Sequence, residues 1–248
     1  STDAAPWEDA AWSAAVFQLS REEVLEQATA AAVTRAKGID AAADASPLAN
    51  KVAATNEELS EFLTDAQNVM SVLDLKLADH SKHHDALKTV QWALIERKQL
   101  AVSYYSPHKR ETFDLVLRPY RLCLIGQAWY LIASPGENNG PRTYRVARMK
   151  SVRMLDNEAL VPDDFSLDDY FGNAWNVFRG STSYNVEVEF APEAAELVAE
   201  TVWHKTQQVK QHADGRATLT FTIDGLDEIV WWVLGWSGRA KVVQPKEL

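Results

Sequence analysis

The chain has 248 residues, 46% of them hydrophobic, and a formal net charge of -10, a composition that excludes a disordered protein. No apolar run approaches the roughly 18 residues of a membrane span, and no basic-then-apolar leader opens the sequence. The single cysteine, Cys123, excludes an internal disulfide framework, so we expect a soluble protein of the reducing cytoplasm.

Residues 1–98 have the pattern of a helical region. Ser20 and Glu23 have the spacing of a capping box, which predicts a helix from there to about residue 37, ended by Gly38. Thr55 and Glu58 repeat the signal and open a second predicted helix, to about residue 70, with apolar residues at 3-4 spacing. The alanine-rich stretch between them, residues 39–54, is broken at Pro47 and predicts a linker.

A third helix is predicted over residues 82–98, with Leu87, Val90, Leu94 and Ala86 on one face. The histidines just before it, in residues 80–85, suggest a metal cluster at first. On a helix, however, only His80 and His84 share a face, and no cysteine accompanies them. We therefore interpret this segment as the start of the helix and expect no metal or other cofactor.

From residue 100 onward the hydrophobic period changes from 3.6 to 2, which predicts five short strands. They are expected at residues 100–105, 113–125, 127–134, 143–149 and 152–156, separated by turn residues. Five short antiparallel strands in so little sequence favour a small SH3-like or Sm-like barrel.

This strand region is basic in an acidic chain. Between residues 96 and 153 there are eleven Lys or Arg and four Asp or Glu, so this module carries +7 and the remainder -17. A local positive surface is what the recognition of an anion requires, while the acidic remainder discourages indiscriminate phosphate binding. A solvated charged edge explains the same pattern, and both interpretations stay open.

Residues 162–180 are acidic and aromatic, and we expect a short helical wrap there. The pairs Asp163-Asp164 and Asp168-Asp169 could act as catalytic carboxylates, but no His or Lys pattern accompanies them, so we interpret them as helix N-terminal acids. The remaining sequence predicts strands or helices at residues 183–190, 192–201, 217–223, 227–234 and 240–244. This order favours a ferredoxin-like α/β sandwich, and an α+β class for the whole chain.

These patterns divide the chain into four parts: a helical connector at 1–98, a β-barrel at 99–160, a linker at 161–182 and an α/β domain at 183–248. In the second part, Val102-Ser103-Tyr104, residues 117–122, Trp129-Tyr130-Leu131 and residues 142–149 occur in an order that resembles a WYL domain. In the fourth part, Val202-Trp203-His204, Asp214-Gly215, Trp236-Ser237-Gly238 and residues 244–248 resemble the extension that follows WYL domains in many bacterial regulators.

The resemblance implies a ligand site made of arginines near the fourth strand and polar residues near the first. Guanidinium groups bind phosphate oxygens in a bidentate manner, and tyrosine faces stack on bases. Our candidates for a nucleic-acid or nucleotide site are Tyr104, Ser106, His108, Arg118, Tyr130, Arg142, Tyr144, Arg145 and Arg148.

Each candidate has a structural alternative. Strand alternation places Tyr144 and Val146 on the face opposite Arg145, so Tyr144, like Trp129, fits a role in the core. Arg148 can lie on the same face as Arg145 only if the strand ends there in a turn. The two arginines could also form surface salt bridges, and His108 could be a turn residue.

The resemblance implies a transcription factor whose sensing part binds a single-stranded nucleic acid or a nucleotide. The protein would act as a homodimer, and the ligand would control its binding to promoter DNA. The resemblance also suggests a role such as the DNA damage response. Such regulators usually begin with a winged helix-turn-helix, and residues 1–100 lack its basic composition. The domain has therefore either been removed or is naturally absent, and the resemblance favours removal. We expect the helical region to be the dimerising connector. A purely structural dimerisation module is the alternative. An enzyme finds little support, because no phosphate-loop, nucleophile-elbow or zinc-protease motif is present.

Overall fold

The computed structural model describes residues 20, 23, 58, 61, 81–136 and 139–248. The capping box at Ser20 is confirmed: its backbone N–H donates to Glu23 Oε2 at 2.7 Å, and the Glu23 N–H donates to Ser20 Oγ at 3.2 Å. The helices and linker predicted over residues 24–57 and 62–70, and His80, lie outside the described residues.

A short 3-10 turn, η1 (Ser81–His83), leads into helix α4 (His84–Ile95), as predicted for the histidine-rich segment. Leu87, Val90 and Ala93 are buried on its inner face. The helix ends before residue 98, because Arg97 adopts a left-handed backbone (φ 52°) and the first strand starts at the next residue.

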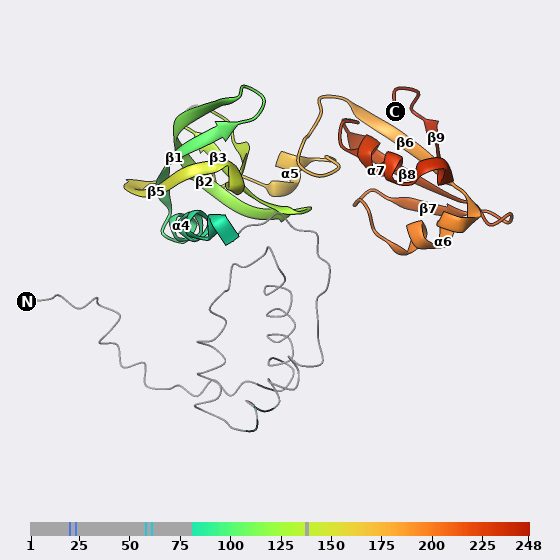
Figure 1. Cartoon of the computed structure of the whole chain (residues 1–248), viewed down its shortest axis with the longest axis horizontal. Helices are drawn as coiled ribbons and strands as arrows, with labels where there is room; N and C mark the ends of the chain where they lie inside the picture. The colour runs from blue at the N-terminus through green and yellow to red at the C-terminus, as the bar shows by residue number, and fades with distance from the viewer. Residues whose placement is uncertain (1–19, 21–22, 24–57, 59–60, 62–80, 137–138) are drawn as a thin grey trace, which may run out of the picture.

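The predicted five strands are present: β1 (Lys98–Ser106), β2 (Glu111–Ile125), β3 (Ala128–Pro135), β4 (Arg142–Arg145) and β5 (Met149–Glu158). They form an antiparallel sheet in the order β4-β3-β2-β1-β5 (Figure 1). The sheet is open, so the prediction of a closed barrel is wrong. The chain leaves β4 at Arg145 and enters the 3-10 turn η2 (Val146–Arg148) before β5, so the strand predicted over 143–149 stops short and no ladder joins the two edges within the described residues.

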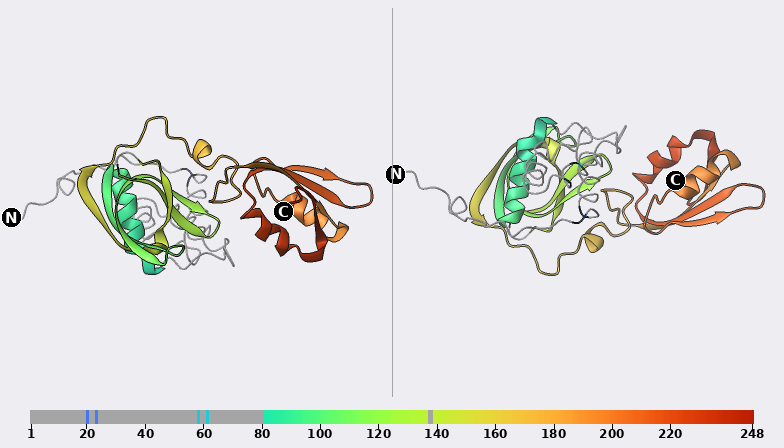
Figure 2. Two further views of the ribbon diagram at one scale, coloured as in Figure 1. Left: turned by 90° about the horizontal axis from the view of Figure 1, so that it is seen from above. Right: turned by 90° about the horizontal axis from the view of Figure 1, so that it is seen from below.

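Helix α4 packs against β1, β2 and β5, across the inner face of the curled sheet (Figure 2). The core between them contains Leu100, Leu117 and Leu131, all completely buried. This packing fixes which face of each strand points inward, and therefore which side chains are left on the outer face.

The C-terminal part contains β6 (Ser183–Phe190), α6 (Pro192–Glu200), β7 (Gln208–Gln211), β8 (Ala217–Asp224), α7 (Ile229–Gly235), the 3-10 turn η3 (Ser237–Arg239) and β9 (Ala240–Gln244). Its antiparallel sheet has the order β7-β8-β6-β9 and its own core. The mixed α+β class is confirmed, whereas the ferredoxin-like assignment stays a prediction.

Between the two sheets lies a linker with one short helix, α5 (Leu167–Phe171), in the predicted acidic and aromatic segment (Figure 1). Ser166 caps this helix by accepting a hydrogen bond from the Asp169 N–H at 3.3 Å. Asp168 and Asp169 lie in its first turn, where the sequence placed them and where the positive end of the peptide dipoles favours acids.

Candidate functional site

Strands β3 and β4 carry the candidate site on their outer face. Trp129, Leu131 and Tyr144 point to the core, where Leu131 is fully buried. The alternating residues point outward. Register pairs Tyr130 with Arg145 on one side and with Cys123 on the other, so these three residues form one row across β2, β3 and β4. We call them the Arg145 row.

The Arg145 row is held in place by Tyr104 of β1. The Arg145 backbone N–H donates to Tyr104 Oη at 3.3 Å, which ties the end of β4 to a strand that it does not pair with. The rings of Tyr104 and Tyr144 meet edge to face, with centroids 5.2 Å apart. Two of the predicted residues therefore support the position of a third.

Tyr144 is 6% exposed and belongs to the core, as the structural alternative for it proposed. Burial raises the pKa of its phenol to about 12, although the nearby Arg142 guanidinium opposes the shift. The Tyr144 hydroxyl therefore stays protonated at neutral pH. Its ring gives Tyr104 a surface to pack on, and its contribution to a ligand site would be indirect.

Arg145 and Arg148 flank the η2 turn, Arg145 as its N-cap and Arg148 as its last residue. Strand β4 therefore ends in a turn, which is the condition for Arg148 to return to the face of Arg145. Both are partly buried. Among the described residues no carboxylate forms an ion pair with either one.

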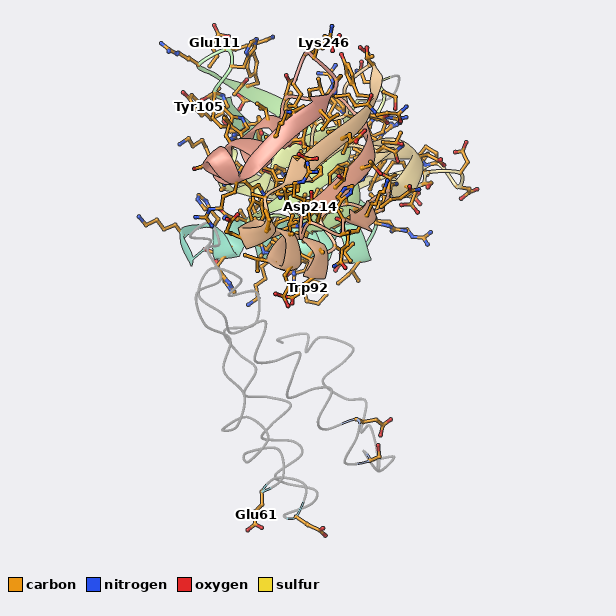
Figure 3. All side chains as sticks on the ribbon, turned by 90° about the vertical axis from the view of Figure 1, so that its right-hand side faces the viewer. Glu61, Trp92, Tyr105, Glu111, Asp214 and Lys246 are labelled. Carbon is orange, nitrogen blue, oxygen red and sulfur yellow. The ribbon has the colours of Figure 1, made fainter. Side chains whose placement is uncertain are left out.

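The other predicted residues are more dispersed. Ser106 ends β1 and His108 is exposed in the turn of the β1–β2 hairpin, the region of Tyr105 and Glu111 in Figure 3. Arg118 pairs with Ser134 across β2 and β3. Arg142 is exposed at the start of β4.

Sequence reasoning missed two cation–aromatic contacts on the same sheet. Lys150 Nζ lies 5.7 Å from the ring centroid of Tyr105, and Lys109 Nζ lies 5.1 Å from that of Phe113. The signal was present as alternating basic and aromatic residues near the hairpin. Pairing them required the register between β1, β2 and β5.

A broad open hollow of about 950 Å³ lies between α4, β2 and the start of the linker, and neither Arg145 nor Arg148 lines it. Trp92, Ile95 and Leu160 line it and are more than half exposed (Figure 3 labels Trp92). Tyr120, Arg97 and Arg121 also line this hollow, but so do the acids Glu158 and Asp163, which would oppose a bound anion. We therefore place the candidate site on the Arg145 row.

The described residues offer no group of three or more His, Cys, Asp or Glu side chains that could hold a metal ion. In the same part of the chain, no helix is long and apolar enough to cross a membrane. Cys123 is half-buried, and burial raises the pKa of its thiol.

Comparison with known proteins identifies two domains: residues 85–154 match the WYL domain and residues 182–248 match the WCX domain. The resemblance stated from the sequence is therefore confirmed. Protein PafC of Mycobacterium leprae is 26% identical over 187 residues, covering 72% of this chain and 53% of that protein. The chain thus spans about half the length of this curated relative.

Two solved structures are also similar. Proteasome accessory factor B/C (PafBC) of Arthrobacter aurescens is 18% identical, with a TM-score of 0.34, over 92% of this chain and 34% of that one. A CRISPR Cas-related protein is 13% identical, with a TM-score of 0.45, over 80% of this chain and 56% of that one.

Proposed function

We propose that this chain, which carries a WYL domain followed by a WCX domain, is the effector-sensing part of a transcriptional regulator. Its effector is a single-stranded nucleic acid, bound through phosphates by Arg145 and Arg148 and through a base by Tyr130. The observation that carries the proposal is the pair of partly buried arginines, which no carboxylate of the described residues neutralises. A partly desolvated guanidinium without an internal partner is suited to bind an external anion.

A single strand fits the outer face better than a duplex or a free phosphate. Tyr130 lies directly opposite Arg145 in the register, so an aromatic ring that can stack on a base and a guanidinium that can bind a phosphate lie side by side. Stacking on an aromatic ring requires an unpaired base, whereas phosphate contacts alone do not distinguish one nucleic acid from another.

The proposal includes a homodimer that responds to the effector and acts on promoter DNA. An effector can change such a system only through its differential affinity for two arrangements of the dimer. The chain is then a binding protein without a cofactor, and labelled single strands incubated with magnesium or manganese stay uncleaved.

The test is fluorescence anisotropy with a labelled twelve-nucleotide thymidine strand at several salt concentrations. We expect the double variant Arg145→Ala, Arg148→Ala to bind more weakly and with a shallower salt dependence. For a single strand, the slope of log affinity against log salt should fall by about 0.7 for each lost phosphate contact.

The matched control is Arg239→Ala with Lys241→Ala, which removes two exposed positive charges from the C-terminal domain. It separates a local site from the effect of net charge. If both variants weaken binding equally, or if the arginine variant keeps the wild-type affinity and slope, Arg145 and Arg148 do not form the site.

A further inference from the structure

The linker crosses the same outer face that carries the candidate site. One row away from the Arg145 row, the register aligns Arg121, Ile132 and Thr143 across β2, β3 and β4; we call these the Thr143 row. Successive residues that point to one face of a strand are about 7 Å apart, so the two rows are direct neighbours.

The linker is docked on the Thr143 row by specific contacts. Tyr170 Oη and Thr143 Oγ1 are hydrogen-bonded at 2.9 Å. Phe165 packs on Tyr120 with ring centroids 5.0 Å apart and lies 6.1 Å from Tyr170. Ile132 is completely buried, although it points away from the core cluster that contains Leu131. The docked segment therefore covers one row and ends beside the next.

This docked segment carries four negative charges and no positive one, from Asp163, Asp164, Asp168 and Asp169. Asp168 forms an ion pair with Lys205 at 3.9 Å, and its carboxylate is almost wholly exposed. The row that this acidic segment covers is about 7 Å from the Arg145 row. Negative charge placed over the neighbouring row disfavours a second anion beside it.

The next part of the linker is fastened to the C-terminal domain. The Glu228 carboxylate accepts hydrogen bonds from the backbone N–H groups of residues 176, 177 and 178, at 2.8 to 3.2 Å. The Asp224 carboxylate accepts from the Asn173 N–H at 3.0 Å and from Arg179 Nε at 3.1 Å. Movement of α5 would therefore be transmitted to the C-terminal domain.

We infer that the acidic linker segment is an internal competitor of the effector, so that ligand binding at the Arg145 row releases residues 163–170 from the Thr143 row. The inference rests on the proposed function and names the regulation of that site. Release frees the C-terminal domain to change its position relative to the N-terminal sheet. Because coupling is reciprocal, any change that weakens linker docking must strengthen ligand binding.

The double variant Thr143→Val, Tyr170→Phe tests this reciprocity, because it removes the hydroxyl pair and keeps both side-chain volumes. With the labelled thymidine strand we expect it to bind about 2- to 10-fold more tightly than the wild type, the range given by the loss of one neutral hydrogen bond. Asp168→Asn with Asp169→Asn should also bind more tightly, since it removes the repulsion. Tyr184→Phe, which removes a hydroxyl from β6, is the control and should leave affinity unchanged.

Hydrogen exchange provides the second readout. The Tyr170 and Gly172 amides donate to the Ser166 and Asp168 carbonyls at 3.0 and 2.8 Å, so their protection reports on α5. A saturating thymidine strand should accelerate their exchange in the wild type. If the strand binds but neither exchange nor the affinity of the hydroxyl variant changes, the inference is wrong while the proposed function stands. If the wild type does not bind the strand, both are overturned.

Discussion

Residues 129 to 131 alternate between two environments, and this alternation separates the structural from the binding side chains. Trp129 and Leu131 pack on the core of the N-terminal sheet. Tyr130, between them, is partly exposed on the Arg145 row. Neighbouring residues of one strand are therefore expected to respond to substitution in opposite ways.

The variant Leu131→Ala should lose about 2–5 kcal/mol of the free energy of unfolding, because it leaves a cavity in a close-packed core. Tyr130→Ala should cost about 1 kcal/mol or less but should weaken binding of a single strand by about 1–3 kcal/mol, the value of one stacked base. Urea denaturation and fluorescence anisotropy measure the two quantities. A stability loss at Tyr130 as large as that at Leu131 would contradict this division.

Alternation in the sequence was enough to predict the inward direction of Tyr144 and the outward direction of Arg145. It could not establish that Tyr104 and Arg145 touch, because β1 and β4 are not paired and their contact depends on the curl of the sheet. The Thr143 row was missed as a docking surface for the same reason. A threonine in a strand has no sequence signal for a partner 27 residues away.

At the scale of elements, the end of the linker passes the end of β8 where two glycines meet. A Cβ on Gly180 would lie 2.6 Å from the Gly225 Cα, and Gly225 has a φ of +100°, which L side chains rarely adopt. The Gly180 N–H donates to the Asp224 carbonyl at 2.7 Å, and the Gly225 N–H donates to the Thr182 carbonyl at 3.0 Å. This crossing keeps the linker in contact with the C-terminal sheet.

We expect Gly225→Ala to destabilise the C-terminal domain by about 1–3 kcal/mol, the usual cost of a strained backbone position. The control is Gly235→Ala at the end of α7, where an added Cβ meets nothing within 4 Å. This control should be neutral or stabilising by up to about 1 kcal/mol, since alanine restricts the unfolded chain. Differential scanning calorimetry compares them, and equal effects would show that the crossing is not tightly constrained.

Most strands could be predicted because their apolar residues alternate. Strand β7 was missed: its four residues are all exposed at a sheet edge, so it has no buried face to create a pattern. The single strand predicted over residues 143–149 divides at Val146, which is buried in the η2 turn instead of continuing the ladder. The sequence could not show that the sheet is open, because this depends on the residue at which β4 ends and the η2 turn begins.

At the scale of the whole molecule, the part of the chain that the structure describes has two separate hydrophobic cores. One joins α4 to β1–β5, and the other joins β6–β9 to α6 and α7. His204 connects the linker to the second core: its ring stacks on Trp175 at 5.8 Å, and its Nε2 donates to the Ala174 carbonyl at 3.2 Å. Nδ1 accepts from the Thr206 N–H at 3.2 Å, so the neutral imidazole satisfies both of its partners.

We expect two thermal transitions, and the stability of the C-terminal one should fall with acidity. Burial lowers the pKa of His204 below its ordinary value of 6.5. Below that pH the unfolded state therefore binds a proton that the folded state does not, so stability is lost as the pH decreases. Calorimetry between pH 7.5 and pH 5, from about one unit above to about 1.5 units below the ordinary histidine pKa, measures the effect. His204→Gln should flatten the dependence, and an unchanged pH slope in this variant would contradict the assignment.

The order of the strands also has a consequence for the time course of folding. In the N-terminal sheet, three of the four pairings join strands that are consecutive in the sequence. In the C-terminal sheet, β6 pairs with β8 and β9, which come later in the sequence and are not its direct successors. Local pairings close short loops and form quickly, and synthesis proceeds from the N-terminus. The Arg145 row is therefore complete on the ribosome before Asp224 and Glu228 have been made, and a nascent chain can display its arginines before its own linker is anchored.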